Sequence, residues 1–389
     1  MSRSGLLYTF VLILMMVMGR LIFPFGDEPD FETRIQRLQD NQYLSVFVNE
    51  LNIEKDSKEC QIISSRGDIF AKISFGCLAK NAEHFVSRMI FSMVVISPII
   101  LILIFRRQMY GFFNLRKSIH YQEWKKRLNA VALSTIFPGM HYALGYLSKE
   151  AITLVVSLLI FIFFGRYLIM SVLLLTLFLI DDGNFIVVLL SLLLYLLFFV
   201  VYRLTNRRVL IITFASIILL AYFFGDALLD LLAENGNYEK LSDILSNNPS
   251  LFDKYPKILR PVITLLSGIF MTPTGVNSIL IYVFSLLFSV FLFFRWGNYF
   301  SMNVSYKLNK DFSLNGDLIP MVAFLVSITT VLVLVFSVPT HSWAKYYMFL
   351  LPFLIYVFLG LVSEATLFYF FIFLNIVLFI NLIFYYVLF

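Results

Sequence analysis

Long apolar runs recur from one end of the chain to the other, and they limit the folds that it can adopt. Of 389 residues, 60% are hydrophobic and only 14% are charged, and the mean hydropathy is +0.86. Soluble domains are closer to half apolar and a quarter charged. Apolar stretches of this length are typical of helices that cross a bilayer. We therefore expect an all-α, polytopic transmembrane bundle that forms a single integral-membrane domain over residues 1–389.

About eleven segments are predicted to cross the membrane as helices. They are residues 5–25, 88–105, 128–147, 151–165, 167–180, 185–202, 209–225, 278–294, 318–338, 346–363 and 365–389. Segments 151–165 and 167–180 are each short for a span, so they form either a hairpin broken at Gly165-Arg166 or one long tilted helix. The first segment is interpreted as an uncleaved span rather than a signal peptide, because no small-residue cleavage site follows it.

The distribution of charge predicts which loops face the cytoplasm. Segment 106–127 holds seven basic residues against one acid, and Arg203, Arg207 and Arg208 form a second basic cluster. Basic loops next to spans stay on the cytoplasmic side. Residues 26–87 and 226–260 then become outer loops, and 261–271 continues the second one as a re-entrant or interfacial segment. The net charge is +6, but the basic residues lie in short loops beside the spans, so this charge does not indicate nucleic-acid binding.

Both cysteines, Cys60 and Cys77, lie in the predicted outer loop 26–87. In an oxidising compartment a disulfide between them would close part of this loop. Two unpaired thiols are the alternative, and the sequence leaves the choice open.

Three carboxylates, Asp27, Glu28 and Asp30, follow the first span at once. Ionisable groups at the mouth of a membrane helix often serve a pathway, a ligand or a reaction. A carboxylate in such surroundings can act as a general base, and neighbouring acids can bind a divalent cation. The alternative is an ordinary solvated start of a loop.

Further polar groups are predicted to gather at the outer ends of other spans. They are Lys149, Glu150, Asp181, Asp182, Lys254, Lys257, Arg260, His341 and Lys345. His141 is predicted inside a membrane helix, either as part of the site or as a packing residue bonded to a neighbour. Pro138 and Gly139 are expected to kink the span that carries His141. The paired acids Asp181 and Asp182 are metal candidates, although Asp and Gly also suit a plain turn there. Arg260 and its neighbouring lysines suit a lipid phosphate, with ordinary headgroup attraction as the alternative.

Signatures of soluble nucleotide chemistry are missing: the sequence has no P-loop, no GxGxxG fingerprint, no HExxH and no zinc spacing. Three other patterns do resemble a known group of proteins. They are the stretch from Ile136-Phe137-Pro138 to Lys149-Glu150, the stretch from Arg260 to Thr272-Pro273-Thr274, and Asp27-Glu28 after the first span. Together they resemble the membrane enzymes of bacterial surface-polysaccharide assembly, which are O-antigen and capsule polymerases and polyprenyl-dependent GT-C glycosyltransferases.

This resemblance implies glycosyl transfer at the outer face of the bacterial inner membrane, between a polyprenyl-linked donor and an acceptor glycan. Asp27 or Glu28 would be the catalytic base. Lys257 and Arg260 would hold the donor phosphate with help from Lys149 or Lys345, while Asp30, His141, Glu150 and His341 would complete the substrate site. The resemblance leaves open whether the enzyme needs a divalent cation and whether it binds other polysaccharide-assembly proteins. A lipid-linked glycan flippase and a non-catalytic component of capsule assembly are the alternatives.

Overall fold

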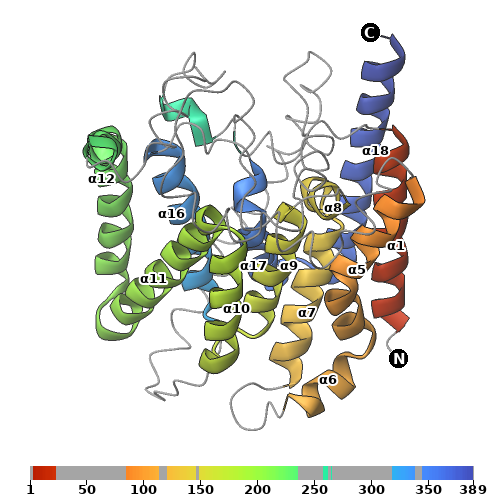
Figure 1. The fold of residues 1–389 in the computed structure, drawn as a ribbon. Helices are drawn as coiled ribbons and strands as arrows, with labels where there is room; N and C mark the ends of the chain where they lie inside the picture. Colours follow the sequence, from red (N-terminus) through yellow and green to blue (C-terminus); the bar gives the residue numbers. More distant parts are fainter. Residues whose placement is uncertain are drawn as a thin grey trace, which may run out of the picture. The chain divides into compact units, whose positions relative to one another are not determined.

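The computed structural model describes residues 3–22, 85–113, 121–145, 149–234, 257–261, 264, 318–337 and 344–388. All regular elements within these ranges are helices (Figure 1), which confirms the all-α part of the prediction. The chain divides into two compact units, which are described separately below. The first comprises Met1–Leu128, Met140–Ile186 and Leu382–Phe389, and the second comprises Asn129–Gly139 and Val187–Asn381. The single-domain organisation stays a prediction.

The first unit is a set of packed apolar helices. It contains α1 (Arg3–Ile22), α5 (Phe85–Ile104), α6 (Arg106–Phe112), the start of α7 (Tyr121–Thr135), most of α8 (Pro138–Gly145), α9 (Lys149–Ile162) and α10 (Tyr167–Ile180). Helix α5 packs against both α1 and α9, and α9 also packs against α10. Nearly every residue of α9 is buried, which explains why it is hydrophobic all round rather than on one stripe.

Helices α9 and α10 form the hairpin that was one of two predicted alternatives. Four residues, Phe163–Arg166, connect them, and Gly165 has φ 87°, a conformation that residues with a Cβ rarely adopt. Each helix has 14 residues and is therefore about 21 Å long, shorter than the roughly 30 Å of a bilayer core. A single tilted helix over this segment is excluded.

Helix α5 ends in a sharp bend. Its axis and that of α6 differ by 90°, with the break at Phe105. The Trp124 indole N–H donates to the Arg106 carbonyl at 3.1 Å, which ties the start of α6 to α7. Segment 106–127 was predicted as a basic loop, but its described parts are helical. Arg127, expected in that loop, is instead fully buried in α7.

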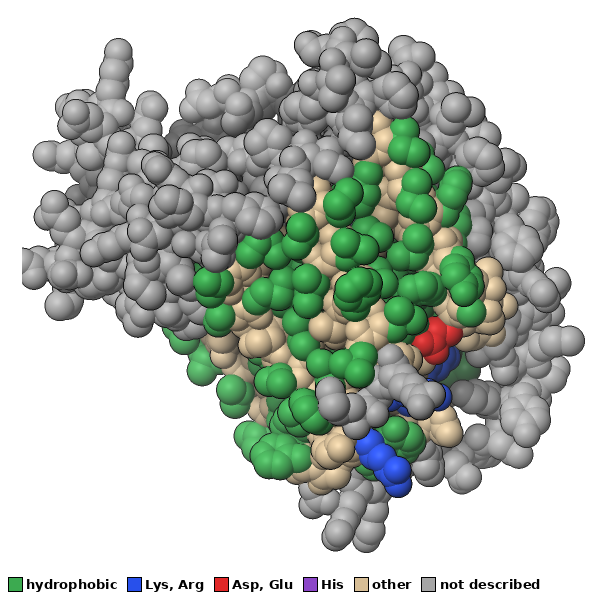
Figure 2. Space-filling view, turned by 90° about the vertical axis from the view of Figure 1, so that its right-hand side faces the viewer, with side chains coloured by type: hydrophobic (Ala, Val, Ile, Leu, Met, Phe, Trp, Pro, Cys, Tyr) green, Lys and Arg blue, Asp and Glu red, His purple; other side chains and the backbone are tan. Residues whose placement is uncertain are grey.

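The outward side of α1 and α5 is strongly apolar. Leu7 and Phe10 on α1 and Val94 and Leu101 on α5 are among the exposed side chains. Figure 2, which looks at this side of the molecule, shows hydrophobic side chains over most of the described face, with basic ones near its lower end. A large exposed apolar face marks a surface that water does not solvate, such as one that contacts lipid.

The second unit is built around two packed helices. It contains most of α11 (Asp182–Leu204), α12 (Arg207–Glu234), η4 (Lys257–Leu259), α16 (Pro320–Ser337), η7 (Ala344–Leu350), α17 (Leu351–Phe358) and most of α18 (Glu364–Leu388). Helix α16 packs against α12 and α17. A Cβ added at Gly225 of α12 would lie 2.9 Å from the Ser337 Cα of α16, so only glycine permits this close approach.

Among the helices in the described ranges, three are long and apolar enough to cross a membrane: Gly183–Leu204, Arg208–Gly225 and Pro320–Ser337. The bent pair Met89–Ile104 and Arg106–Phe112 adds a fourth if it counts as one span. The expectation of about eleven spans is therefore not confirmed. Among the other described helices, α9 and α10 have only 14 residues each, and α7 and α8 are separated at Pro138. Helices α1 and α18, with 20 and 25 residues, coincide with the predicted segments 5–25 and 365–389.

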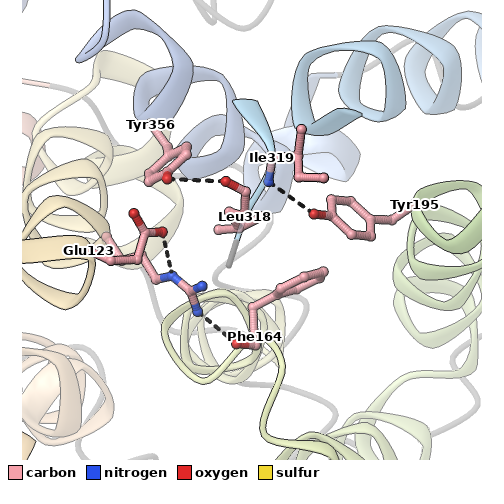
Figure 3. A network of polar contacts seen from close by, with 7 residues as sticks. Glu123, Phe164, Tyr195, Leu318, Ile319 and Tyr356 are labelled. Carbon is pink, nitrogen blue, oxygen red and sulfur yellow. Dashed lines mark hydrogen bonds and ion pairs between the residues drawn. The ribbon is translucent and has the colours of Figure 1, made fainter. Parts of the chain in front are cut away.

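Buried side chains satisfy the backbone groups that these breaks release. In the first unit, Arg127 Nη1 donates to the Phe164 carbonyl in the α9–α10 turn at 2.7 Å (Figure 3). In the second, the Tyr195 hydroxyl accepts from the Ile319 N–H at 3.1 Å, and the Tyr356 hydroxyl donates to the Leu318 carbonyl at 3.3 Å. Unpaired backbone groups are too costly to leave in an apolar interior. The breaks are thus integral to the fold.

Asn375 performs the same role at the Pro138 break, and its replacement provides a test. Its side-chain N–H₂ donates to the Ile136 carbonyl at 2.7 Å and to the Phe371 carbonyl at 2.8 Å, and Asn375 is fully buried. We expect Asn375→Leu to lower the free energy of unfolding by about 1–3 kcal/mol, because the Ile136 carbonyl loses its donor. Thermal unfolding in detergent measures the effect. Ile376→Leu, at an exposed neighbouring position, is the control and should change little.

Candidate anion-binding site

The best-defined cluster of predicted site residues is in the second unit, beside one end of α12. Lys257 is the first residue of η4, and Arg260 follows that element directly. With three residues per turn, side chains at positions i and i+3 of a 3₁₀ helix lie above one another. Lys257 and Arg260 are therefore about one turn apart along this short segment. The sequence predicted that these two cations act together.

Aromatic side chains fix the position of Lys257. Its Nζ lies 5.6 Å from the centre of the Tyr222 ring, a cation–π contact. The Tyr222 ring packs edge-on against Phe336 of α16 at 5.3 Å between ring centres. Gly225 lies one turn further along α12, in close contact with Ser337 of α16. Figure 1 shows the short segment, in teal, near the upper ends of α12 and α16.

Arg260 carries the strongest chemical signal in this cluster. Its Nε and Nη1 atoms are buried, and neither finds a hydrogen-bond acceptor in the described parts of the chain. Its own carbonyl accepts a hydrogen bond from the Thr264 hydroxyl at 2.9 Å, which holds the backbone. A buried donor without an acceptor costs about 1–3 kcal/mol, and more when charged. Such donors are usually completed by a bound group.

The cluster lies at the opposite end of a candidate span from a basic turn. Arg203 and Arg208 flank the turn between α11 and α12, and Arg203 stacks over the Phe199 ring at 5.3 Å. Tyr222 is 14 residues beyond Arg208, or about 21 Å along the helix. If the basic turn faces the cytoplasm, as the charge rule predicts, Lys257 and Arg260 lie toward the outer face.

This arrangement can bind an anion. The guanidinium group is planar, remains charged and fits phosphate oxygens with several N–H groups, while a lysine adds a compact positive charge. In the two turns of α12 around Tyr222, the apolar side chains of Leu219, Leu220, Phe223 and Phe224 are exposed. A cationic end beside an apolar helix face suits an amphiphile with an anionic head.

Several predicted site residues lie outside the described ranges. They are Asp27, Glu28, Asp30, Cys60, Cys77, Lys254 and His341. Lys345 belongs to η7 and Lys149 begins α9, but their side chains are not described. The proposed base, the disulfide and the contacts of these residues therefore stay predictions.

His141 and Glu150 are in the first unit. His141 lies on α8 and is almost fully buried, as expected of a polar residue that faces protein. Nearby, the Ser92 hydroxyl donates to the Gly145 carbonyl at the end of α8, at 3.0 Å. Glu150 is in the first turn of α9 and is partly exposed. Neither residue is placed relative to Arg260.

Asp181 has a capping role at the start of α11. Its Oδ1 accepts the backbone N–H groups of Gly183 and Asn184 at 3.0 and 3.3 Å, and its Oδ2 accepts from the Asn184 side chain at 3.2 Å. This is N-cap geometry. Within the described residues no group of three His, Cys, Asp or Glu side chains could hold a metal ion. The turn interpretation accounts for Asp181, and the side chain of Asp182 is not described.

One buried charged pair was missed at the sequence level. Arg127 Nε lies 3.1 Å from Glu123 Oε1, and the Arg127 side chain is fully buried. The spacing i, i+4 between a carboxylate and an arginine, at the start of an apolar run, is the signal that could have revealed it. Both residues were counted as loop charges instead.

The chain has no match among known proteins in any of three comparisons, with protein families, with curated proteins and with solved structures.

Proposed function

We propose that the chain is an integral-membrane glycosyltransferase or polymerase in bacterial surface-polysaccharide assembly. It acts on polyprenyl-linked sugars at the outer face of the cytoplasmic membrane, within a multi-pass bundle of about eleven spans. The observation that carries the proposal is that two buried guanidinium nitrogens of Arg260, close in sequence to Lys257, have no hydrogen-bond acceptor in the described parts of the chain. A phosphate group supplies that acceptor, and the position at the end of a candidate span suits a phosphate borne by a lipid.

In this proposal the two cations act on the leaving group. A carboxylate, Asp27 or Glu28, takes the proton from the acceptor hydroxyl, whose oxygen then bonds to the anomeric carbon of the donor sugar. The bond between that carbon and the phosphate oxygen breaks, and the lipid phosphate leaves with the electron pair. Arg260 and Lys257 stabilise the developing charge on it. Holding donor and acceptor in one bilayer plane adds to the rate.

A lipid-linked glycan flippase is a second candidate, and the broken helices favour it. Short paired helices such as α9 and α10, and the break at Pro138, are common in transporters that bind substrate at membrane depth. Reconstituted vesicles distinguish the two candidates. A flippase moves the lipid-linked glycan to the other leaflet without lengthening it, whereas a polymerase lengthens it without requiring translocation.

The proposed enzyme activity is tested at the predicted base. We expect Asp27→Ala or Glu28→Ala to slow chain extension by about 100-fold or more, the usual contribution of a general base. The measurement is the length ladder of surface polysaccharide on a gel, at equal protein levels. Asp40→Ala, an acid of the same predicted loop, is the matched control and should keep the ladder. Unchanged ladders in both test variants would remove the catalytic assignment.

A further inference from the structure

Helix α6 is held across the end of α5 by contacts on several sides. The 90° bend at Phe105 turns it away from the α5 axis, and Figure 1 shows it below α5 and α7. The Tyr110 ring packs edge-on against Tyr121 at 5.3 Å. Phe113, which follows α6, packs against Phe163 in the α9–α10 turn at 4.6 Å. The helix therefore has a defined position, although none of its residues is buried.

Positive charge collects where α6 meets α7. The Trp124 indole donates to the Arg106 carbonyl, and Arg107 and Lys125 are the next residues along the chain on the two sides of this hydrogen bond. Arg107 is exposed and Lys125 partly exposed, and neither forms an ion pair with the described residues. The one acid of this region, Glu123, is already paired with buried Arg127. This end of the unit is accordingly cationic.

Exposed apolar side chains lie at the same end. Phe112, the last residue of α6, is 78% exposed. Tyr167 and Leu168, just after the α9–α10 turn, are 68% and 81% exposed. The α9–α10 turn lies at this end of the unit because Arg127 of α7 donates a hydrogen bond to the Phe164 carbonyl in that turn. Aromatic and apolar groups mixed with basic ones are typical of the headgroup layer of a membrane.

We infer that α6 lies in the cytoplasmic headgroup layer, where Arg107 and Lys125 bind the phosphate of an anionic phospholipid. Charge complementarity selects this occupant: an exposed cationic surface bordered by apolar side chains matches an anionic head above acyl chains. The 90° bend places the axis of α6 across that of α5, which suits a helix that lies flat on the bilayer beside a span. The site is independent of the proposed enzyme activity and of Arg260.

The test is a lipid titration of the full-length chain in detergent, followed by native mass spectrometry. Phosphatidylglycerol is compared with phosphatidylcholine, which has the same chains but no net charge. We expect the wild type to prefer phosphatidylglycerol, and Arg107→Ala/Lys125→Ala to weaken its binding about tenfold or more, since each basic residue near an anionic surface contributes about 1 kcal/mol. Arg107→Lys/Lys125→Arg keeps the charge and should retain the preference.

The matched control is Arg203→Ala/Arg208→Ala, which removes two exposed basic residues from the α11–α12 turn. An equal loss in that variant would mean general attraction to anionic lipid and would overturn a site at α6. Equal affinity of the wild type for the two lipids would also overturn it. Should the alanine pair fail to fold, the single variant Arg107→Gln gives the same comparison at one exposed position.

Discussion

Arg260→Ala is expected to weaken the binding of a polyprenyl phosphate by about 10- to 150-fold. Hydrogen bonds from a charged donor contribute about 1.5–3 kcal/mol each, and every 1.4 kcal/mol corresponds to a factor of ten. Arg260→Lys keeps the charge but loses the planar set of donors, so its affinity should fall between those of the wild type and the alanine variant. Lipid-phosphate affinity in detergent, measured by native mass spectrometry, gives the comparison.

A stability measurement separates this binding role from a structural one. Nε and Nη1 of Arg260 have no acceptor in the described parts of the chain. The buried guanidinium group therefore lowers the stability of the protein when no ligand is bound. Arg260→Met should then leave the unfolding temperature unchanged or raise it while affinity falls. Arg203→Ala, in the last turn of α11 beside the basic turn, should leave affinity as it is. A large loss of stability without lipid, or equal affinity in all variants, would contradict the phosphate role.

The second large effect is expected at the buried pair in α7. Glu123→Ala should lower the free energy of unfolding by about 3–5 kcal/mol, because it leaves the buried Arg127 guanidinium without its counter-charge. Arg127→Met/Glu123→Ala removes both charges, so we expect it to be less destabilising than Glu123→Ala alone. The remaining cost of the double variant comes from the Phe164 carbonyl, which loses its donor.

Equilibrium unfolding of the four variants of this double-mutant cycle gives the coupling between the two side chains. Glu150→Ala is the control, since this acid is also partly buried in the first turn of its helix but forms no ion pair with a described residue. If the double variant is as unstable as the sum of the two single variants, the two charges do not act as a pair. A buried pair of this kind is expected to show clear coupling.

The sequence was sufficient to predict where the helices lie, but not how many of them cross a membrane. Apolar runs predict helices because both soluble cores and lipid favour them, and described helices match ten of the eleven predicted segments. Whether α9 and α10 cross a membrane depends on where the chain reverses. One glycine with φ 87° reverses it after 14 residues. The sequence allowed that outcome and also allowed a continuous helix.

The candidate site was predictable in part. The basic, aromatic approach to Pro261 indicated a phosphate site, and the resemblance assigned it to Lys257 and Arg260. Their partner Tyr222 is 35 residues earlier in the chain, and no local pattern links it to Lys257. Arg127 was missed for a related reason. A charge at the edge of a basic segment resembles its neighbours until tertiary contacts show that it is buried.

The length of the α9–α10 hairpin has a consequence for the surrounding lipid. Its turn is tied to the cationic end of the unit, while Glu150 and Asp181 lie at the other ends of the two helices. About 21 Å of helix falls roughly 9 Å short of an average hydrocarbon layer. If the hairpin crosses a bilayer as the sequence predicts, the hydrocarbon layer must thin around it to keep Glu150 and Asp181 in contact with water. Lipid headgroups next to these two carboxylates would then lie deeper than elsewhere in the membrane.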